Sequence, residues 1–110
     1  MPEEHTYRVI VRGRFTDLDD AGRARLLAVA DRHDMLTAGG FSADGGLSYD
    51  HTLDFFSFRV QLRAEVEATD RAVCARARAL AASAVEELGV DFRDLRASAT
   101  DMDLIKVKRR

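Results

Sequence analysis

The stretch "TYRVIVRGRF", residues 6–15, decides the fold, because apolar and charged side chains alternate along it. Successive side chains of a β-strand point to opposite faces. One face therefore carries Tyr7, Val9, Val11 and Phe15, and the other carries Ile10 with Arg8, Arg12 and Arg14. This alternation predicts a strand with one face in the core and a mostly charged face outside it.

The segment "FFSFRVQLR", residues 55–63, alternates in the same way and gives the strongest strand signal of the chain. Its aromatic and β-branched residues favour a strand. The apolar face consists of Phe56, Phe58, Val60 and Leu62, and the opposite face consists of Ser57, Arg59, Gln61 and Arg63. A second strand thus presents arginines on the side turned away from the core.

Two segments have the periodicity of helices. In the first, Thr16 is the expected N-cap, Asp19 completes a capping box, and the helix is expected to end before Gly39-Gly40. In the second, Gly89 is expected to end the helix in the left-handed conformation. Its apolar stripe consists of Val73, Ala77, Leu80, Ala81, Ala84 and Leu88.

Two shorter strands complete the pattern. The sequence Asp44-Gly45-Gly46 suits a tight turn, so residues 41–42 and 47–49 are expected to form a small hairpin. Near the C-terminus, Leu95, Ala97 and Ala99 alternate with Arg96, Ser98 and Thr100. This alternation predicts a last strand, which also carries an arginine on its polar face.

The elements follow the order strand, helix, strand, strand, helix, strand, which predicts an α+β domain of ferredoxin-like βαββαβ split topology. In this topology both helices cover one face of an antiparallel sheet, and the first and third strands lie in its centre. Residues 1–110 are expected to form one such domain. The other sheet face is then open and carries Arg8, Arg12, Arg14, Arg59, Arg63 and Arg96.

The composition of the chain limits its partners. With 110 residues, 46% of them hydrophobic, the chain can bury one core, and its net charge of -2 gives no overall attraction to nucleic acid or to anionic membranes. Any basic site must therefore be local. The single cysteine, Cys74, fits a reducing compartment, and no apolar run is long enough to cross a bilayer. We expect a cytoplasmic protein with no membrane partner.

Three segments carry a resemblance: "HTYRVIVRGRFTDLDDAGRARLL", "GGLSYDHTLDFFSFRVQLR" and "ATDMD". Together they resemble a family of small, uncharacterised actinobacterial proteins, and the resemblance covers nearly the whole chain. It implies one compact domain and transfers no activity. The expected topology is also similar to that of dimeric ferredoxin-like α/β-barrel proteins, some of which are cofactor-free monooxygenases or cyclases of polyketide tailoring. Fold-level similarity of this kind does not fix a function.

Four interpretations fit the arginine-rich face: a solvated surface, a homodimer interface, a site for an anionic small molecule, or an RNA-binding surface. Like charges on neighbouring strands destabilise a sheet, which disfavours a merely solvated face. RNA-binding sheets stack bases on an aromatic-rich motif that this chain lacks, so nucleic acid is disfavoured as well. A homodimer, with arginines paired to Asp50, Glu65 or Asp101 of a second copy, and an anionic ligand within it remain the favoured interpretations.

Candidate catalytic groups are His51 and Asp54, in the turn before residues 55–63. A histidine near carboxylates can act as a general base near neutral pH, although a polar turn that satisfies its own backbone is the commoner explanation of such a cluster. Asp101 and Asp103 form a second pair of acids. No spacing typical of a metal site or of a nucleotide-binding loop occurs, so neither a metal nor a cofactor is expected.

These observations predict either a protein that binds anionic metabolites, including aromatic ones, or an accessory tailoring enzyme that acts on such a metabolite. The expected ligand-binding residues are Arg8, Arg12, Arg59, Arg63 and Tyr49. The alternative is a non-catalytic dimerisation or protein-interaction module, in which the same arginines form salt bridges with a partner.

Overall fold

The structure, a computed structural model, describes residues 4–34, 40–65 and 68–103 and is of the α+β class, as predicted. In chain order the elements are β1 (Glu4–Thr16), α1 (Asp20–Ala28), the short 3-10 helix η1 (Ala30–Arg32), β2 (Gly46–Tyr49), β3 (Phe55–Glu65), α3 (Asp70–Glu87) and β4 (Asp91–Asp101). The strands form one antiparallel sheet in the order β2-β3-β1-β4. The first and third strands are therefore central, as the sequence predicted.

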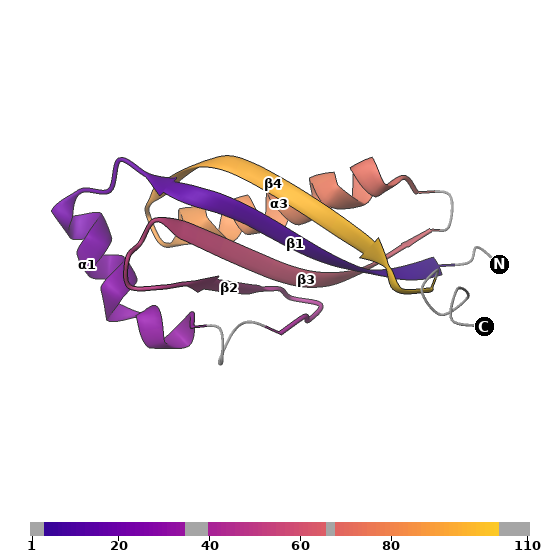
Figure 1. Cartoon of the computed structure of the whole chain (residues 1–110), viewed down its shortest axis with the longest axis horizontal. Helices are drawn as coiled ribbons and strands as arrows, with labels where there is room; N and C mark the ends of the chain where they lie inside the picture. Colours follow the sequence, from indigo (N-terminus) through magenta and orange to yellow (C-terminus); the bar gives the residue numbers. More distant parts are fainter. Residues whose placement is uncertain (1–3, 35–39, 66–67, 104–110) are drawn as a thin grey trace.

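Helix α3 packs along one face of the sheet, and the core lies between them (Figure 1). The apolar face of β1 supplies Tyr7, Val9, Val11 and Phe15, and that of β3 supplies Phe56, Phe58, Val60 and Leu62, all of them buried as expected. The buried stripe of α3 consists of Val73, Ala77, Ala81 and Val85. Its small side chains let the helix lie close to the strands.

The expected stripe of α3 was wrong at one position. Leu80 is 40% exposed, because Val85, and not Leu80, continues the four-residue spacing of the residues that face the sheet. The end of the helix agrees with the prediction: Gly89 has a φ of 73°, and Val90 is buried just after it. Among the described helices, none has the length and apolar character that crossing a membrane requires.

Helix α1 departs from the prediction in both position and length. Thr16 is the last residue of β1, and the N-cap is Asp19, whose carboxylate accepts a hydrogen bond from the Gly22 amide at 2.7 Å. The helix ends at Ala28, buries only Gly22 and Leu26, and lies beyond the end of the sheet (Figure 1). The prediction that both helices cover one sheet face is therefore wrong for α1, because so short an apolar stripe cannot cover the strands.

The small hairpin predicted between residues 41–42 and 47–49 does not form. Residues 41–42 are not a strand, and β2 pairs with β3 instead. The turn itself exists, since the Gly45 amide donates to the Ser42 carbonyl at 3.3 Å and to the Ser42 hydroxyl at 3.1 Å. The Ser42 carbonyl also accepts from the Gln61 amide at 2.8 Å, so this segment is attached to β3 directly.

Replacing Gly45 with alanine should destabilise the protein by at least about 1–2 kcal/mol, the cost of a left-handed conformation for a residue with a Cβ atom. Gly45 has a φ of 86°, and a Cβ there would lie 2.1 Å from Cζ of the buried Phe58. Urea unfolding measures the change. The control is Gly40→Ala, where a Cβ would meet no atom within 4 Å, so equal losses at both positions would contradict this explanation.

Candidate functional site

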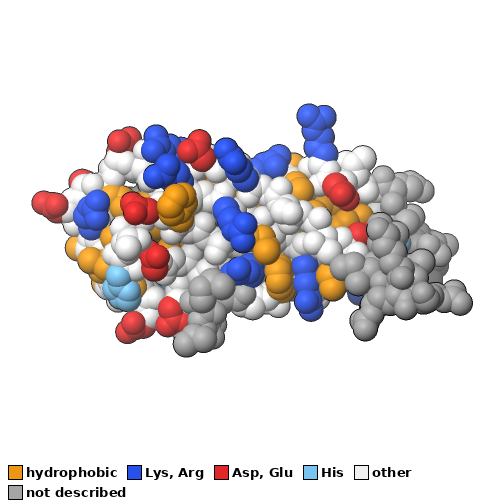
Figure 2. Space-filling view, viewed as in Figure 1, with side chains coloured by type: hydrophobic (Ala, Val, Ile, Leu, Met, Phe, Trp, Pro, Cys, Tyr) orange, Lys and Arg blue, Asp and Glu red, His pale blue; other side chains and the backbone are white. Residues whose placement is uncertain are grey.

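The sheet face that α3 leaves uncovered carries the arginines of the strands, and Figure 2 shows basic side chains gathered along it. We call this surface the arginine face; it consists of Arg8, Arg12, Arg14, Arg59, Arg63, Arg93 and Arg96. Between the two central strands the arginines are staggered: Arg8 pairs with Gln61, Arg12 with Ser57, Ile10 with Arg59 and Thr6 with Arg63. The sequence predicted that these arginines are neighbours, and the register adds that β1 and β3 place none of them directly opposite another.

On the other side of β1 the arrangement is the reverse, because arginines of β4 lie directly opposite those of β1. Arg12 pairs with Arg96, and Arg14 pairs with Arg93. A register shift makes this possible: Gly13 alone separates the two β1 residues, whereas Asp94 and Leu95 separate the two β4 residues. Asp94 has a φ of 59°, and this β-bulge turns both Arg93 and Arg96 to the arginine face despite their odd spacing. Like charges held opposite each other destabilise the sheet.

Several arginines of this face are held by neighbouring side chains. The Arg63 Nε atom lies 3.2 Å from the Glu4 carboxylate, and the Arg8 Nε atom donates to the Gln61 side chain at 3.2 Å. The guanidinium of Arg14 lies 4.7 Å from the ring centre of Phe55. Phe55 is itself 60% exposed, which is unusual for a phenylalanine and makes it the most exposed large apolar side chain of the described residues.

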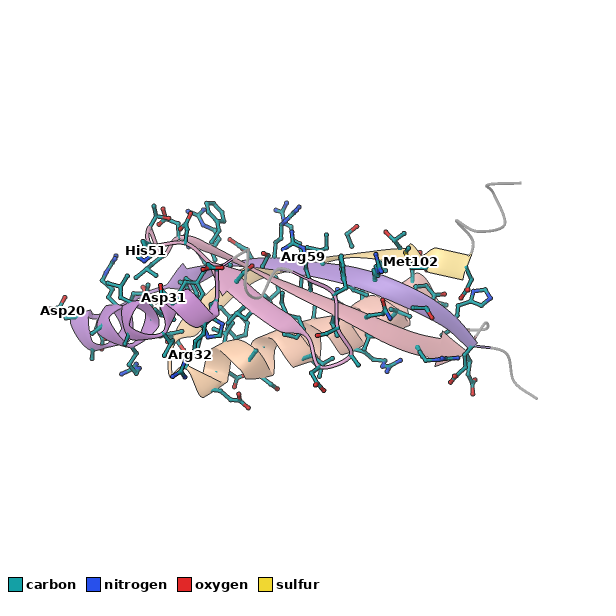
Figure 3. All side chains as sticks on the ribbon, turned by 90° about the horizontal axis from the view of Figure 1, so that it is seen from below. Asp20, Asp31, Arg32, His51, Arg59 and Met102 are labelled. Atoms are coloured by element: carbon teal, nitrogen blue, oxygen red, sulfur yellow. The ribbon has the colours of Figure 1, made fainter. Side chains whose placement is uncertain are left out.

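A pocket of about 400 Å³ lies where β2 and the turn before β3 meet the arginine face; we call it the turn-side pocket. Its lining consists of Arg12, Ala30, Asp34, Ser48, Tyr49, Asp50, His51, Phe55, Phe56 and Ser57. The pocket thus brings together three residues that the sequence predicted, Arg12, Tyr49 and His51. Figure 3 shows His51 at this end of the sheet and Arg59 on the side away from α3.

The remaining predicted residues lie outside this pocket. Asp54 is exposed and does not line it; its backbone carbonyl accepts a hydrogen bond from the Phe15 amide at 3.0 Å. Arg8, Arg59 and Arg63 lie further along the strands, with Arg63 at the opposite end of β3. The pocket lining therefore includes His51 but not Asp54, although the two residues are close in sequence.

The polar groups of the turn-side pocket differ in what they can do. Hydrogen bonds from the Thr52 hydroxyl and the Thr52 amide hold the pKa of the Asp50 carboxyl below its usual value, so Asp50 is ionised at neutral pH. Burial raises the pKa of Tyr49, whose hydroxyl donates to the Leu26 carbonyl at 2.6 Å. Tyr49 is nearly buried, with its ring packed against Phe15 and His33, so it forms part of the pocket wall, whereas His51 is exposed.

A second pocket, of about 310 Å³, lies beside the β4 bulge; we call it the bulge-side pocket. Its lining consists of Arg12, Gly13, Arg14, Phe55, Asp94 and Arg96. Arg12 and Phe55 line both pockets and so stand between them. Phe55 was not among the predicted site residues, although the alternation of residues 55–63 puts it on the same face as Arg59. No sequence pattern predicted that Asp94 lines a pocket, because its position on this face depends on the β-bulge.

A third cluster lies at the other end of the sheet. The His5 Nδ1 atom lies 2.7 Å from the Asp101 carboxylate, and the Asp103 carboxylate accepts from the Thr6 amide at 2.8 Å. One possible ligand atom from each of His5, Asp101 and Asp103 lies within 4.8 Å of the others, which is compact enough for a metal ion. Burial, followed by the charge of Asp101, raises the pKa of the adjacent Tyr7. The internal hydrogen bonds account for this arrangement, and the expectation of no metal stays a prediction.

The fold and the two pockets define a class: a small α+β protein with a four-stranded antiparallel sheet, one face of which is open and lined with arginine. Within that class the chain belongs to DUF6204, a family of unknown function whose model matches residues 1–110. This confirms the resemblance to an uncharacterised family, while the actinobacterial origin stays a prediction. No match was found among curated proteins or among solved structures.

Proposed function

We propose that this protein binds an anionic aromatic small molecule in the turn-side pocket, as a binding protein or as an accessory tailoring enzyme. The observation that carries the proposal is the junction of Arg12 and Phe55, where a guanidinium group and a 60% exposed phenyl ring border the same depression. An aromatic ligand would lie against Phe55, with the nearly buried Tyr49 in the pocket wall, and its anionic group would meet the guanidinium of Arg12.

The other arginines of the proposed site act through their charge. Arg59 and Arg8 lie on the same face as Arg12, in the next two residue pairs along β1 and β3. Their positive charges raise the electrostatic potential that an approaching anion meets. Arg63 contributes less, because the Glu4 carboxylate lies beside it. For an accessory enzyme, His51 is the proton-transfer group that the pocket offers. Asp54 does not line the pocket and is left out of the proposed site.

The test compares 2-naphthoate with its uncharged analogue 2-naphthamide in a thermal-shift titration and by calorimetry. A ligand that binds the native state raises the apparent stability with its concentration, so naphthoate should raise Tm and naphthamide should not. Phe55→Ala should weaken naphthoate binding by about threefold to tenfold, the loss expected for one aromatic contact. The control is Arg71→Gln, an exposed arginine of α3 on the far side of the sheet. Equal shifts from both compounds, or none from naphthoate, would refute the proposal.

The second candidate is a homodimer formed through the arginine face, without catalysis. A four-stranded sheet with one uncovered face commonly gains stability by association, and Ile10 lies on this face between the arginines of β1. Of the proposed partner acids, Asp101 is bound to His5 and nearly buried, which leaves Asp50 and Glu65. The double variant Arg12→Gln/Arg59→Gln distinguishes the two candidates when its mass is measured by light scattering and its naphthoate binding by calorimetry. A fall in mass with unchanged binding supports assembly, and unchanged mass with lost binding supports the ligand site.

We also propose that the fold is a form of the ferredoxin-like βαββαβ split topology in which α1 lies beyond the end of the sheet and α3 alone covers the sheet face. The element order and the central position of β1 and β3 support this assignment. The similarity to dimeric ferredoxin-like proteins would then extend to the use of the open sheet face, which is the surface such proteins pair around a cavity. A cytoplasmic location fits the free thiol of Cys74.

A further inference from the structure

We propose that the bulge-side pocket binds a phosphate group, so that the ligand of this protein is an aromatic phosphate monoester. This inference rests on the proposed function, because the organic part of the ligand would occupy the turn-side pocket. The two pockets share Arg12 and Phe55, so one molecule can reach both.

The charges that line the bulge-side pocket favour a dianion. Arg12, Arg14 and Arg96 contribute three guanidinium groups, and Asp94 contributes one carboxylate. The lining therefore has an excess of two positive charges. A phosphate monoester carries a charge of about -1.5 to -2 at pH 7, whereas a carboxylate carries only one negative charge. The three oxygens of the phosphate also match the paired N–H donors of several guanidinium groups at once.

The backbone is arranged to bring these guanidinium groups together at a cost in stability. The register places Arg96 directly opposite Arg12, and the bulge at Asp94 places Arg93 opposite Arg14. Like charges directly opposite each other are destabilising in a sheet, and between β1 and β3 the register avoids them. A bound dianion would remove this repulsion. Arg93 lies 3.8 Å from the Asp94 carboxylate and does not line the pocket, so it is not part of the proposed site.

Phe55 determines which phosphates fit. Arg14 covers part of its ring at 4.7 Å, yet the side chain remains 60% exposed. An aromatic group joined to the phosphate would lie against the exposed part of this ring and extend over Ser57 into the turn-side pocket. Inorganic phosphate would make the ionic contacts alone and should bind more weakly than the ester.

The experiment measures the affinity for 2-naphthyl phosphate, 2-naphthoate and inorganic phosphate by calorimetry at fixed salt. Arg96→Gln should weaken 2-naphthyl phosphate by about tenfold or more, as expected for a lost hydrogen bond between charged groups, and should change 2-naphthoate by less than about twofold. Asp94→Asn should act in the opposite direction and tighten 2-naphthyl phosphate, because it removes the one negative charge of the pocket. Asparagine tolerates the left-handed backbone at this position. Arg71→Gln is the matched control.

Each other outcome separates this inference from the proposed function. If Arg96→Gln weakens both naphthyl ligands equally, or if Asp94→Asn weakens the phosphate, the phosphate site is refuted and the aromatic anion site stands. If the phosphate ester binds in an Arg96-dependent manner and naphthoate does not bind, the phosphate site stands and the proposed carboxylate function falls. If oligouridylate bound more tightly than 2-naphthyl phosphate, and if this binding depended on Arg63 at the far end of the face, both proposals would be refuted in favour of an RNA-binding surface.

Discussion

Replacing Phe56 with alanine should lower the free energy of unfolding by about 3–5 kcal/mol, the range for deleting a buried phenyl ring. Phe56 is 2% exposed on the covered face of β3. Its ring lies 5.0 Å from that of Phe15 and 6.4 Å from that of Phe92. It also fills the space beside Gly13, where a Cβ atom would come within 2.5 Å of the Phe56 ring. Truncation would leave a cavity in the core, between the rings of Phe15 and Phe92, that the rigid strands cannot close.

The adjacent residue provides the control for this prediction. Phe55 lies on the opposite face of the same strand and is 60% exposed. Phe55→Ala should therefore change the free energy of unfolding by less than about 0.5 kcal/mol, as is usual for a surface substitution. Guanidinium unfolding of the two variants compares the faces directly. Comparable losses from both substitutions would mean that the face assigned as open is covered.

Replacing Arg12 with glutamine should weaken both 2-naphthoate and 2-naphthyl phosphate by about tenfold to a hundredfold, because hydrogen bonds between charged groups contribute roughly 1.5–3 kcal/mol. Arg12 is the arginine that lines both pockets. The same substitution should leave the stability of the free protein unchanged or slightly higher, since it removes the repulsion between Arg12 and Arg96. Calorimetry gives the first effect, and urea unfolding without ligand gives the second.

A loss of binding without a loss of stability would exclude a merely structural role for Arg12. A residue that stabilised the fold would lose binding and stability together when replaced. Arg71→Gln, which removes one positive charge from α3, should preserve both affinities. If Arg71→Gln reduced binding as much as Arg12→Gln, the overall charge of the protein, and not the site, would account for the loss.

The alternation of residues predicted the central strands and their faces, because a side-chain period of two follows from strand geometry alone. It placed Arg8, Arg12 and Arg59 correctly on one face, where the structure has them. The sequence could not predict the register between the strands. The direct pairing of Arg12 with Arg96 depends on a left-handed residue at Asp94, and aspartate adopts that conformation too rarely for the sequence to indicate it.

Long-range contacts explain the remaining differences. His5 and Asp101 are 96 residues apart, and only the pairing of β1 with β4 brings them together. Asp54 and His51 are neighbours in sequence, yet the turn directs only His51 to the pocket lining. The start of α1 was misplaced because Thr16 continues the pairing of β1 with β4, which outweighs its preference for a helix N-cap.

An amide NMR titration of the unaltered protein with 2-naphthyl phosphate tests most directly whether the open, arginine-lined sheet face is a ligand site. We predict saturable chemical-shift changes at residues 12–14, at Phe55 and at residues 94–96, the segments that surround the two pockets. The amides of α3, on the covered side of the sheet, should not change. Shifts centred on α3, or no saturable shift at about 5 mM ligand, a concentration that reveals even millimolar affinity, would contradict the account.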